Sequence, residues 1–220
     1  MKREYNIQGI EFVAFDIESS KTLQYLQDEF DRELMNLGEL TLPKNPVIVD
    51  IGANVGVISF YLAKKYPDAK IYAYEPHPSN YKNLVKGIAE NGINNVFPFN
   101  KAVLEESGLE VEIYLDEENS GASSIYYPSS GSATVETISL PDIVKENGIE
   151  KIDYLKIDCE GAEFDILEKT EALYRGEIPI GEIFVEIHSF MQSEGERNII
   201  ELLTRIKDMK NVRAMRYFIV

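Results

Sequence analysis

Two glycines after one buried strand and a carboxylate at the end of the next form a pattern typical of nucleoside-binding sites. The first of these predicted strands contains Asp50 and leads into a turn with Gly52, Asn54 and Gly56. Glycine allows a tight turn and a close approach of ligand to backbone, and a helix that begins there presents backbone amides. Glu75 ends the next predicted strand, where its carboxylate can accept hydrogen bonds from both hydroxyls of a ribose.

The composition of this turn discriminates between cofactors. A dinucleotide fingerprint reads G-x-G-x-x-G, whereas here Asn54 occupies the second glycine position, and no G-K-[ST] phosphate-binding sequence follows. Adenosylmethionine has no phosphate and carries a cationic sulfonium, so a pocket framed by Asp50 and Glu75 suits it better than it suits NAD. The alternative is that Gly52 and Gly56 form only a strand–helix turn and that Glu75 is a solvated strand end.

A second group of polar residues lies at the ends of two later predicted strands. Asp158 and Glu160 follow one strand, and Glu186 and His188 lie two positions apart on the other, which directs both side chains to one face. Methyl transfer to a hydroxyl needs a proton acceptor within hydrogen-bonding reach, and His188 is the predicted base because its ordinary pKa lies near neutrality. Glu186 is predicted to orient it, and Asp158 to bind the cofactor's ammonium group or the acceptor hydroxyl.

Two alternatives remain for this group. His188 is the kind of residue that also serves as a structural histidine bonded to neighbouring backbone, and the four side chains together are able to bind Mg²⁺ or Mn²⁺. Their spacing fits no strict ligand motif, so we predict no metal. Cys159 is expected to be packed rather than reactive.

Alternating strand and helix patterns surround these residues from residue 46 onward. Strands are predicted at 47–51, 70–75, 95–100, 152–158 and 182–188, with a last one at the end of the chain. Ser79 is the predicted cap of a helix that ends at Gly92, and Ser193 with Glu196 forms the capping-box pattern of a later helix. Repeated βα units predict an α/β fold with a mainly parallel central sheet and helices on both faces, whose ligand lies beyond the carboxyl ends of the strands.

Two segments depart from this alternation. Residues 1–45 are predicted to be an accessory piece with a β-type segment at 9–16 and an amphipathic helix, whose apolar stripe is Leu23, Leu26, Phe30, Leu34 and Leu37. Residues 104–140 alternate apolar and polar side chains and are predicted to be an antiparallel β insertion. Residues 46–220 are then the catalytic domain. The loop at 119–132, with Ser123, Ser124, Tyr126 and Tyr127, is better placed than the acidic segment before it to touch an acceptor; the alternative is a plain surface hairpin.

The overall charge narrows the range of partners. Lys and Arg total 22 against 38 Asp and Glu, a net charge of −16, which disfavours binding to nucleic acid and to anionic membrane surfaces. No apolar run approaches the roughly 20 residues of a membrane span, and the first residues lack the apolar stretch of a signal peptide. With a single cysteine, Cys159, no intramolecular disulfide forms, and we expect a cytoplasmic protein.

Several motifs in order resemble the FkbM-like methyltransferases, which belong to the Rossmann-like class I methyltransferases. The matching stretches are VIVDIGANVGVIS, YEPHPSNYKNL, VETISLPDI, IDYLKIDCEGAEFDIL and FVEIH, which together span about 46–190. Family members often have Leu-Asp where this chain has Leu140-Pro141-Asp142, and the chain ends soon after its last predicted strand, so the usual final hairpin of the class is expected to be short or absent.

The resemblance implies roles for individual residues. Adenosylmethionine would be the methyl donor, and a hydroxyl on a sugar, lipid or other small molecule the acceptor. The implied cofactor-binding residues are Asp50, Gly52, Asn54, Gly56, Glu75, Pro76, Asn100, Lys101, Ala102 and Asp158; the implied lining of the reacting end is Asp158, Glu160, Glu186 and His188.

The sequence therefore predicts an adenosylmethionine-dependent O-methyltransferase that acts on a small molecule or a glycan. Methylation of RNA or protein, and a module that binds the cofactor without turnover, are the alternatives; net charge argues against RNA, and the complete set of acids and histidine argues against a binding module.

Overall fold

The computed structural model describes residues 1–31, 35–116, 118–129, 131–188, 199–207, 209 and 212–219. The predicted capping box at Ser193 and Glu196 lies outside the described residues, as does Leu34 of the predicted apolar stripe.

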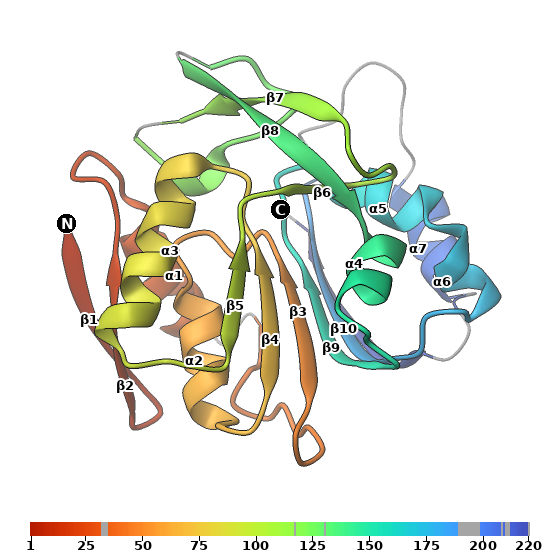
Figure 1. Ribbon diagram of the computed structural model, residues 1–220, viewed down its shortest axis with the longest axis horizontal. Helices are drawn as coiled ribbons and strands as arrows, with labels where there is room; N and C mark the ends of the chain where they lie inside the picture. Colours follow the sequence, from red (N-terminus) through yellow and green to blue (C-terminus); the bar gives the residue numbers. More distant parts are fainter. Residues whose placement is uncertain are drawn as a thin grey trace.

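Six parallel strands form the central sheet (Figure 1). In spatial order they are β11 (Val212–Ile219), β10 (Ile180–Ile187), β9 (Ile152–Ile157), β3 (Val47–Ile51), β4 (Lys70–Tyr74) and β5 (Val96–Phe99). Every neighbouring pair is parallel. Chain order reverses between β3 and β9, and a ligand binds at such a reversal beyond the carboxyl ends of the strands. The predicted α/β fold with a mainly parallel sheet is confirmed.

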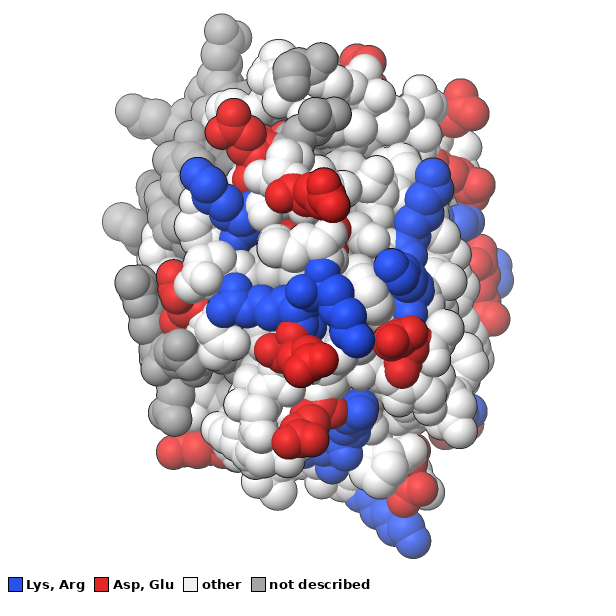
Figure 2. Space-filling model, turned by 90° about the vertical axis from the view of Figure 1, so that its left-hand side faces the viewer, with Lys and Arg blue, Asp and Glu red and all other residues white. Residues whose placement is uncertain are grey.

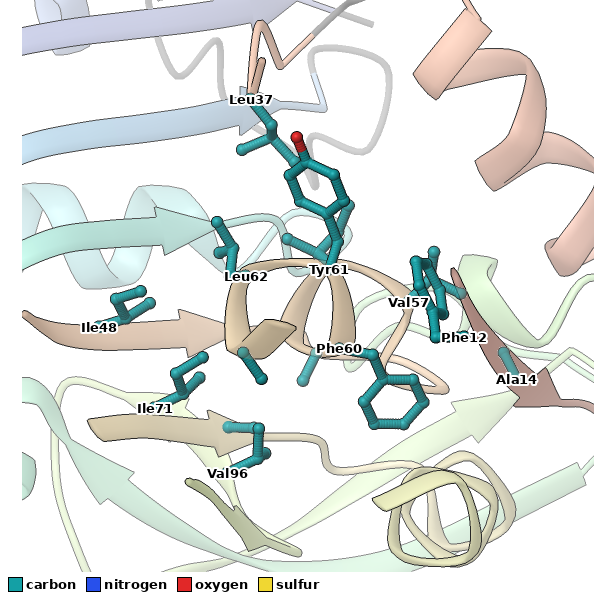
Figure 3. Close-up of a cluster of buried hydrophobic side chains, with 14 of the residues drawn as sticks. Phe12, Ala14, Leu37, Ile48, Val57, Phe60, Tyr61, Leu62, Ile71 and Val96 are labelled. Atoms are coloured by element: carbon teal, nitrogen blue, oxygen red, sulfur yellow. The ribbon is translucent and has the colours of Figure 1, made fainter. Parts of the chain in front are cut away.

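The sheet separates two apolar cores. On one face, α2 (Val57–Lys65) and α3 (Pro78–Glu90) pack over the strands; Phe60 and Leu62 of α2 share a buried cluster with Ile48 and Ile71 of the sheet, whereas Tyr61 points toward Leu37 (Figure 3). On the other face lie four helices of the described residues, namely α4 (Leu140–Glu146), α5 (Glu163–Lys169), α6 (Glu171–Arg175) and α7 (Ile199–Lys207). Burial of both faces explains why the strands are apolar at nearly every position.

The cap of α3 differs from the prediction. His77, not Ser79, is the N-cap: its Nδ1 accepts a hydrogen bond from the Ser79 backbone N–H at 3.1 Å, and Pro78 occupies the first helical turn. Proline has no backbone N–H, and it is tolerated in the first turn because an N–H there has no intrahelical acceptor. The helix therefore begins at Pro78, and the residue before it is the N-cap. At the other end the stop is confirmed, since Gly92 adopts a φ of 62° just after the helix.

The N-terminal segment adds a hairpin to the core of α2 and α3. β1 (Lys2–Ile7) and β2 (Ile10–Phe15) pair in antiparallel register across a turn in which Gln8 and Gly9 both have positive φ. The prediction identified only the second of these strands. α1 (Thr22–Asp31) follows and buries Leu23 and Leu26 as expected, whereas the side chain of Phe30 lies outside the described part of the chain.

The insertion forms a separate three-stranded sheet, in the order β6 (Ala102–Leu104), β8 (Gly131–Ser139) and β7 (Glu110–Leu115). β7 and β8 are antiparallel, as predicted, whereas β6 pairs with β8 in parallel. The short 3-10 helix η1 (Ser120–Ala122) lies in the connection between β7 and β8. This sheet lies beyond the carboxyl ends of the central strands (Figure 1).

β11 runs parallel to β10 at the edge of the sheet. Pro141, where family members often have no proline, lies in the first turn of α4, and proline is tolerated there because a first-turn N–H has no intrahelical acceptor. The Ser139 hydroxyl caps this helix by accepting the hydrogen bond of the Asp142 backbone N–H.

Candidate active site

A cavity of about 350 Å³ opens at the carboxyl ends of the central strands, where the chain order reverses. That volume is in the range of small-molecule sites. Its wall includes these residues from the predicted set: Gly52, Asn54, Glu75, Pro76, Lys101, Ala102, Asp158, Glu160, Glu186 and His188. The structure thus brings the two predicted groups of polar residues to one cavity.

The glycine turn, residues 52–56, is joined directly to Glu75. The backbone N–H of Asn54 donates to Glu75 Oε2 at 2.7 Å, and the N–H of His77 donates to Glu75 Oε1 at 2.8 Å. Gly52 has a φ of 75°, and a Cβ at this position would lie 1.6 Å from the carbonyl oxygen of Asp158, so no side chain fits. The Asn80 side chain also hydrogen-bonds to Glu75, and because a carboxylate has about four acceptor positions, Glu75 keeps capacity for a ligand hydroxyl.

Burial changes the acidity of Glu75. Loss of solvent around the buried side chain raises the pKa of Glu75 to about 7, although the His77 and Asn54 amides and the Lys156 charge act in the opposite direction. A carboxylate held half-protonated near neutrality in a cavity wall is more typical of a ligand-binding position than of a structural one.

Three predicted cofactor-binding residues lie behind the cavity wall rather than in it. The carboxylate of Asp50 is fully buried and accepts from the Ser59 hydroxyl at 2.6 Å. A Cβ on Gly56 would lie 2.5 Å from both Leu84 and Phe60, so this glycine allows close packing of α2 and α3. The Asn100 amide donates to the backbone carbonyls of Glu75 and Pro76, 2.9 Å from each, and so fixes the segment that carries Glu75.

Lys156, which the sequence analysis did not single out, connects the two groups of acids. Its Nζ lies 3.4 Å from Asp50 and 3.0 Å from Asp158, and it donates to the Gly52 carbonyl at 3.0 Å. The ammonium group is almost entirely buried, and although burial lowers the pKa of Lys156, the neighbouring carboxylates outweigh it and raise the pKa far above its ordinary value. A lysine inside a predicted central strand is the signal that could have identified it, since a buried lysine needs an acidic partner.

The second group is organised around His188 at the end of β10. Its Nε2 lies 3.4 Å from Glu160 and its Nδ1 lies 2.5 Å from Glu163, a residue absent from the predicted set. Glu163 is fully buried and also accepts from the backbone N–H of His188 at 2.9 Å and of Gly161 at 2.6 Å. The predicted orienting residue was Glu186; in the structure the contact that orients the imidazole is made by Glu163.

These contacts set the charge of His188. Burial lowers the pKa of the imidazole, but the hydrogen bond to Glu163 and the charges of Glu160, Glu163 and Asp158 outweigh it and raise the pKa to about 10. At neutral pH the free protein therefore holds His188 as the imidazolium. An imidazolium has no lone pair with which to take a proton, which speaks against His188 as the base in this state.

The cavity is covered by parts of the chain that the sequence assigned to accessory roles. Thr22 and Tyr25 of α1 and the segment 119–123 of the insertion line it. Buried hydroxyls join the two: Ser120 Oγ donates to Asp16 at 3.0 Å and lies 3.1 Å from the Thr22 hydroxyl. We call these two pieces, Thr22 with Tyr25 and residues 119–123, the roof. Of the loop residues predicted to touch an acceptor, Ser123 lines the cavity, whereas Ser124, Tyr126 and Tyr127 do not.

The surface charge is mixed on the face where β1, β2 and α3 lie. Lys and Arg side chains gather in a short row near the centre of that face, with Asp and Glu side chains above and below it (Figure 2). One contact at this side of the molecule is the pair of Lys2 and Glu90, 3.6 Å apart. An anionic polymer would therefore meet carboxylates on either side of the row.

Among the described residues, no helix is both long enough and apolar enough to cross a membrane.

Comparison with known proteins defines the family. Residues 50–217 match the family described as the methyltransferase FkbM domain, so the chain belongs to the FkbM methyltransferases and is a methyltransferase enzyme. The resemblance seen in its motifs is confirmed.

Individual relatives match the chain at low sequence identity. The chain is 32% identical over 161 residues to methyltransferase sdnD of Sordaria araneosa, a match that covers 59% of this chain and 62% of that protein. It is 24% identical over 196 residues to the hexuronic acid methyltransferase AglP of Haloferax volcanii, covering 88% and 76%. It is 26% identical over 179 residues to the 2-O-methyltransferase NoeI of Sinorhizobium fredii, covering 66% and 72%.

Proposed function

We propose that the protein transfers a methyl group from adenosylmethionine to a hydroxyl of a small molecule or glycan, in the cavity at the carboxyl ends of β3, β4, β9 and β10. One observation carries this proposal: the glycine turn and Glu75 meet through a 2.7 Å hydrogen bond in the wall of an open cavity. Had the two segments been far apart, or the space filled by side chains, no nucleoside would fit between them.

The residues present fit such a donor. Glu75 keeps acceptor capacity for a ribose hydroxyl, and the wall contributed by Asp158, Glu160 and Glu186 is acidic, which suits a cationic sulfonium and its ammonium group. The absence of a second glycine at Asn54 argues against NAD, since a dinucleotide requires the backbone to approach its pyrophosphate there.

When bound, the donor supplies a methyl group on a positively charged sulfur. The chain's own part is to hold the acceptor in line with that methyl group and to accept the hydroxyl proton. Because His188 carries a proton in the free protein, we assign proton acceptance to the carboxylate side of the wall, Glu160 or Glu186, and give His188 a positioning role.

A sugar hydroxyl is the acceptor class that we favour. Two relatives carry names that specify a sugar acid or a 2-O position as the methylated group, and the match to the first of them covers most of this chain. Because these relatives are only 24% and 26% identical to this chain, the acceptor is to be identified by a screen and not from their names.

We further propose that residues 46–220 form the catalytic domain and that residues 1–45 act as an accessory piece that completes the cavity. Thr22 and Tyr25 line it, and the backbone N–H of Gly121 in the insertion donates to the Thr22 hydroxyl at 3.0 Å.

Calorimetry with adenosylmethionine and, separately, with NAD tests the donor. We expect heat with adenosylmethionine alone, and at least tenfold weaker binding for Glu75→Ala, while the exposed control Glu90→Ala binds as wild type. A thermal melt confirms that Glu75→Ala is folded. Heat with NAD but none with adenosylmethionine would overturn the proposal.

A screen of hydroxyl acceptors then tests the reaction. Neutral sugars, uronic acids and small phenols are incubated with adenosylmethionine, and S-adenosylhomocysteine is measured by mass spectrometry. We expect turnover with at least one sugar. Binding of adenosylmethionine with turnover only on RNA or protein would replace the favoured acceptor class with the alternative one.

A further inference from the structure

Three side chains of types that commonly ligate metals converge in the wall of the cavity. We call Asp158, Glu160 and His188 the acid–histidine cluster; each offers one ligand atom, and these atoms all lie within 4.8 Å of one another. Ligands on opposite sides of an octahedral ion at about 2.1 Å are about 4.2 Å apart, so small side-chain rotations are enough to close the set around a divalent cation.

His188 is held as a metal-bound histidine is held. Metal-ligating histidines usually have the second ring nitrogen fixed by a carboxylate, which sets the direction of the first. Here Glu163, which is outside the cluster and fully buried, contacts Nδ1 at 2.5 Å and leaves Nε2 directed toward Glu160 and the cavity. The side chain of His188 is only 5% exposed.

The two carboxylates of the cluster face the cavity. The side chain of Asp158 is 20% exposed and that of Glu160 is 19% exposed, so a cation bound between them would keep open positions for water or for an oxygen of a substrate. The backbone at Glu160 has a φ of 54°, an uncommon conformation for a residue with a side chain. In it, Glu160 projects toward His188 instead of into solvent.

Negative charge is in excess around the cluster. Five carboxylates lie along this end of the cavity and behind it, those of Asp50, Asp158, Glu160, Glu163 and Glu186, and the one lysine among them, Lys156, is shared between Asp50 and Asp158. Even with an imidazolium counted, the carboxylates outnumber the cations, which favours a divalent cation at this point.

From this geometry we propose that the acid–histidine cluster binds a divalent cation of the Mn²⁺ type, through one oxygen each of Asp158 and Glu160 and through Nε2 of His188, which releases its Nε2 proton to solvent when the cation binds. Two carboxylates with one imidazole and open positions suit Mn²⁺ or Mg²⁺ better than a closed, sulfur-rich structural metal site would.

The cation has a place in the reaction, a part of the inference that rests on the proposed methyl transfer. Bound there, the cation would supply Lewis-acid stabilisation to the acceptor oxygen, and the Glu186 carboxylate, which lines the same cavity and is not a ligand, would accept the hydroxyl proton. The oxygen then forms a bond to the methyl carbon, and the carbon–sulfur bond breaks with its electron pair left on sulfur.

Paramagnetic Mn²⁺ is the probe for a test that needs neither donor nor acceptor. The full chain is stripped with EDTA, and Mn²⁺ is titrated while the signal of the free ion is followed by electron paramagnetic resonance. We expect one ion per chain with a dissociation constant below about 1 mM. The proposal would be overturned if no Mn²⁺ binds, or if it binds no more tightly than to an unrelated acidic protein.

The chain has two histidines, so one variant of each shows which of them binds the metal. Electron spin echo modulation from an imidazole nitrogen should appear on the bound Mn²⁺ in wild type and in His77→Asn, whose side chain caps α3 and does not line the cavity. In His188→Asn the nitrogen modulation should disappear and affinity should fall at least tenfold. Modulation that persists in His188→Asn, or is lost in His77→Asn, contradicts the site.

Glu160→Gln keeps the test decisive if His188→Asn does not fold. It should weaken Mn²⁺ binding at least tenfold and retain the nitrogen modulation, whereas the neighbour Glu186→Gln should change affinity less than fivefold. Equal losses in both variants would mean a diffuse electrostatic effect and no site. Because adenosylmethionine binding is measured separately without metal, failure of the cation site and failure of the proposed function give different results.

Discussion

The two ends of the cavity are built in different ways. At the glycine turn the geometry is set by backbone: the N–H groups of Gly52 and Ala53 both donate to the Tyr74 carbonyl at 3.0 Å, and the N–H of Asn54 donates to Glu75. At the acid–histidine cluster it is set by charged side chains that hold one another, with Lys156 and Glu163 behind them. Backbone hydrogen bonds hold the glycine turn in one shape, which suits a ligand of one shape. The ion pairs between side chains change when a charged ligand binds next to them.

The largest expected effect comes from placing a side chain in the backbone-built end. Gly52→Ala would put Cβ 1.6 Å from the Asp158 carbonyl, so the turn or β9 must move, and we expect a loss of more than about 4 kcal/mol in the free energy of unfolding. Urea denaturation measures it.

Gly92→Ala is the matched control for that substitution. Gly92 also has a positive φ, of 62°, but nothing lies within 4 Å of its added Cβ, so only the conformational cost of about 1 kcal/mol is expected. Similar losses in the two variants would show that conformation, and not the close approach of β3 and β9, is what requires glycine at position 52.

Replacement of the buried Lys156 tests the end of the cavity that is built from side chains. Lys156→Met leaves the buried Asp50 carboxylate without its charge partner, and we expect a loss of about 3 kcal/mol in the free energy of unfolding. Adding Asp50→Asn should restore part of that loss, since the neutral amide still accepts the Ser59 hydrogen bond. A double variant no more stable than Lys156→Met would show that the charge balance does not hold this end together.

The roof should contribute less than either end. Ser120→Ala removes a buried hydroxyl that bonds to Asp16 and lies against Ser20 and Thr22, and we expect a loss of about 1–2 kcal/mol together with faster release of adenosylmethionine. Stopped-flow dissociation and urea denaturation measure the two effects. Ser132→Ala, which removes an exposed hydroxyl in the same insertion, should leave both quantities unchanged.

The smallest effect concerns the acidity of Glu75. Its pKa is raised to about 7 by burial, so the carboxylate loses its charge as the pH falls from 8 to 6. If ribose hydroxyls bind the ionised form, affinity for adenosylmethionine should weaken about tenfold over that range. Glu75→Gln, measured in parallel, accounts for titration of the ligand's own amino group. An identical pH profile in the variant would remove Glu75 as the origin of the effect.

Much of the backbone-built end could be predicted from the sequence. Repeated strand and helix patterns predicted a parallel sheet with helices on both faces, and the ends of these strands placed residues 52, 75, 158 and 188 at one edge. Glycine spacing is local information, because a positive φ or a close approach is required at one position of the chain. The misplaced cap at Ser79 was also a local question, decided by Pro78.

The side-chain-built end could be predicted only in part. Asp158, Glu160 and His188 were expected to meet, yet the partner of His188 proved to be Glu163, 25 residues away in the chain and one helical turn beyond the predicted acids. Lys156 was overlooked although a lysine inside a predicted central strand is visible in the sequence. The protonation of His188 was not predictable at all, because it depends on the distances from one ring to three carboxylates.

The sequence by itself determined the fold class, the family and the gathering of the predicted site residues at one edge of the sheet, since these follow from local periodicity, from motifs and from the order of strands. Only the tertiary structure decided which side chain holds which, that α1 and the insertion cover the cavity, and that His188 carries a proton. The physical reason is range: hydrophobic periodicity and turn chemistry act within a few residues, whereas burial and charge pairing depend on groups that folding alone brings together.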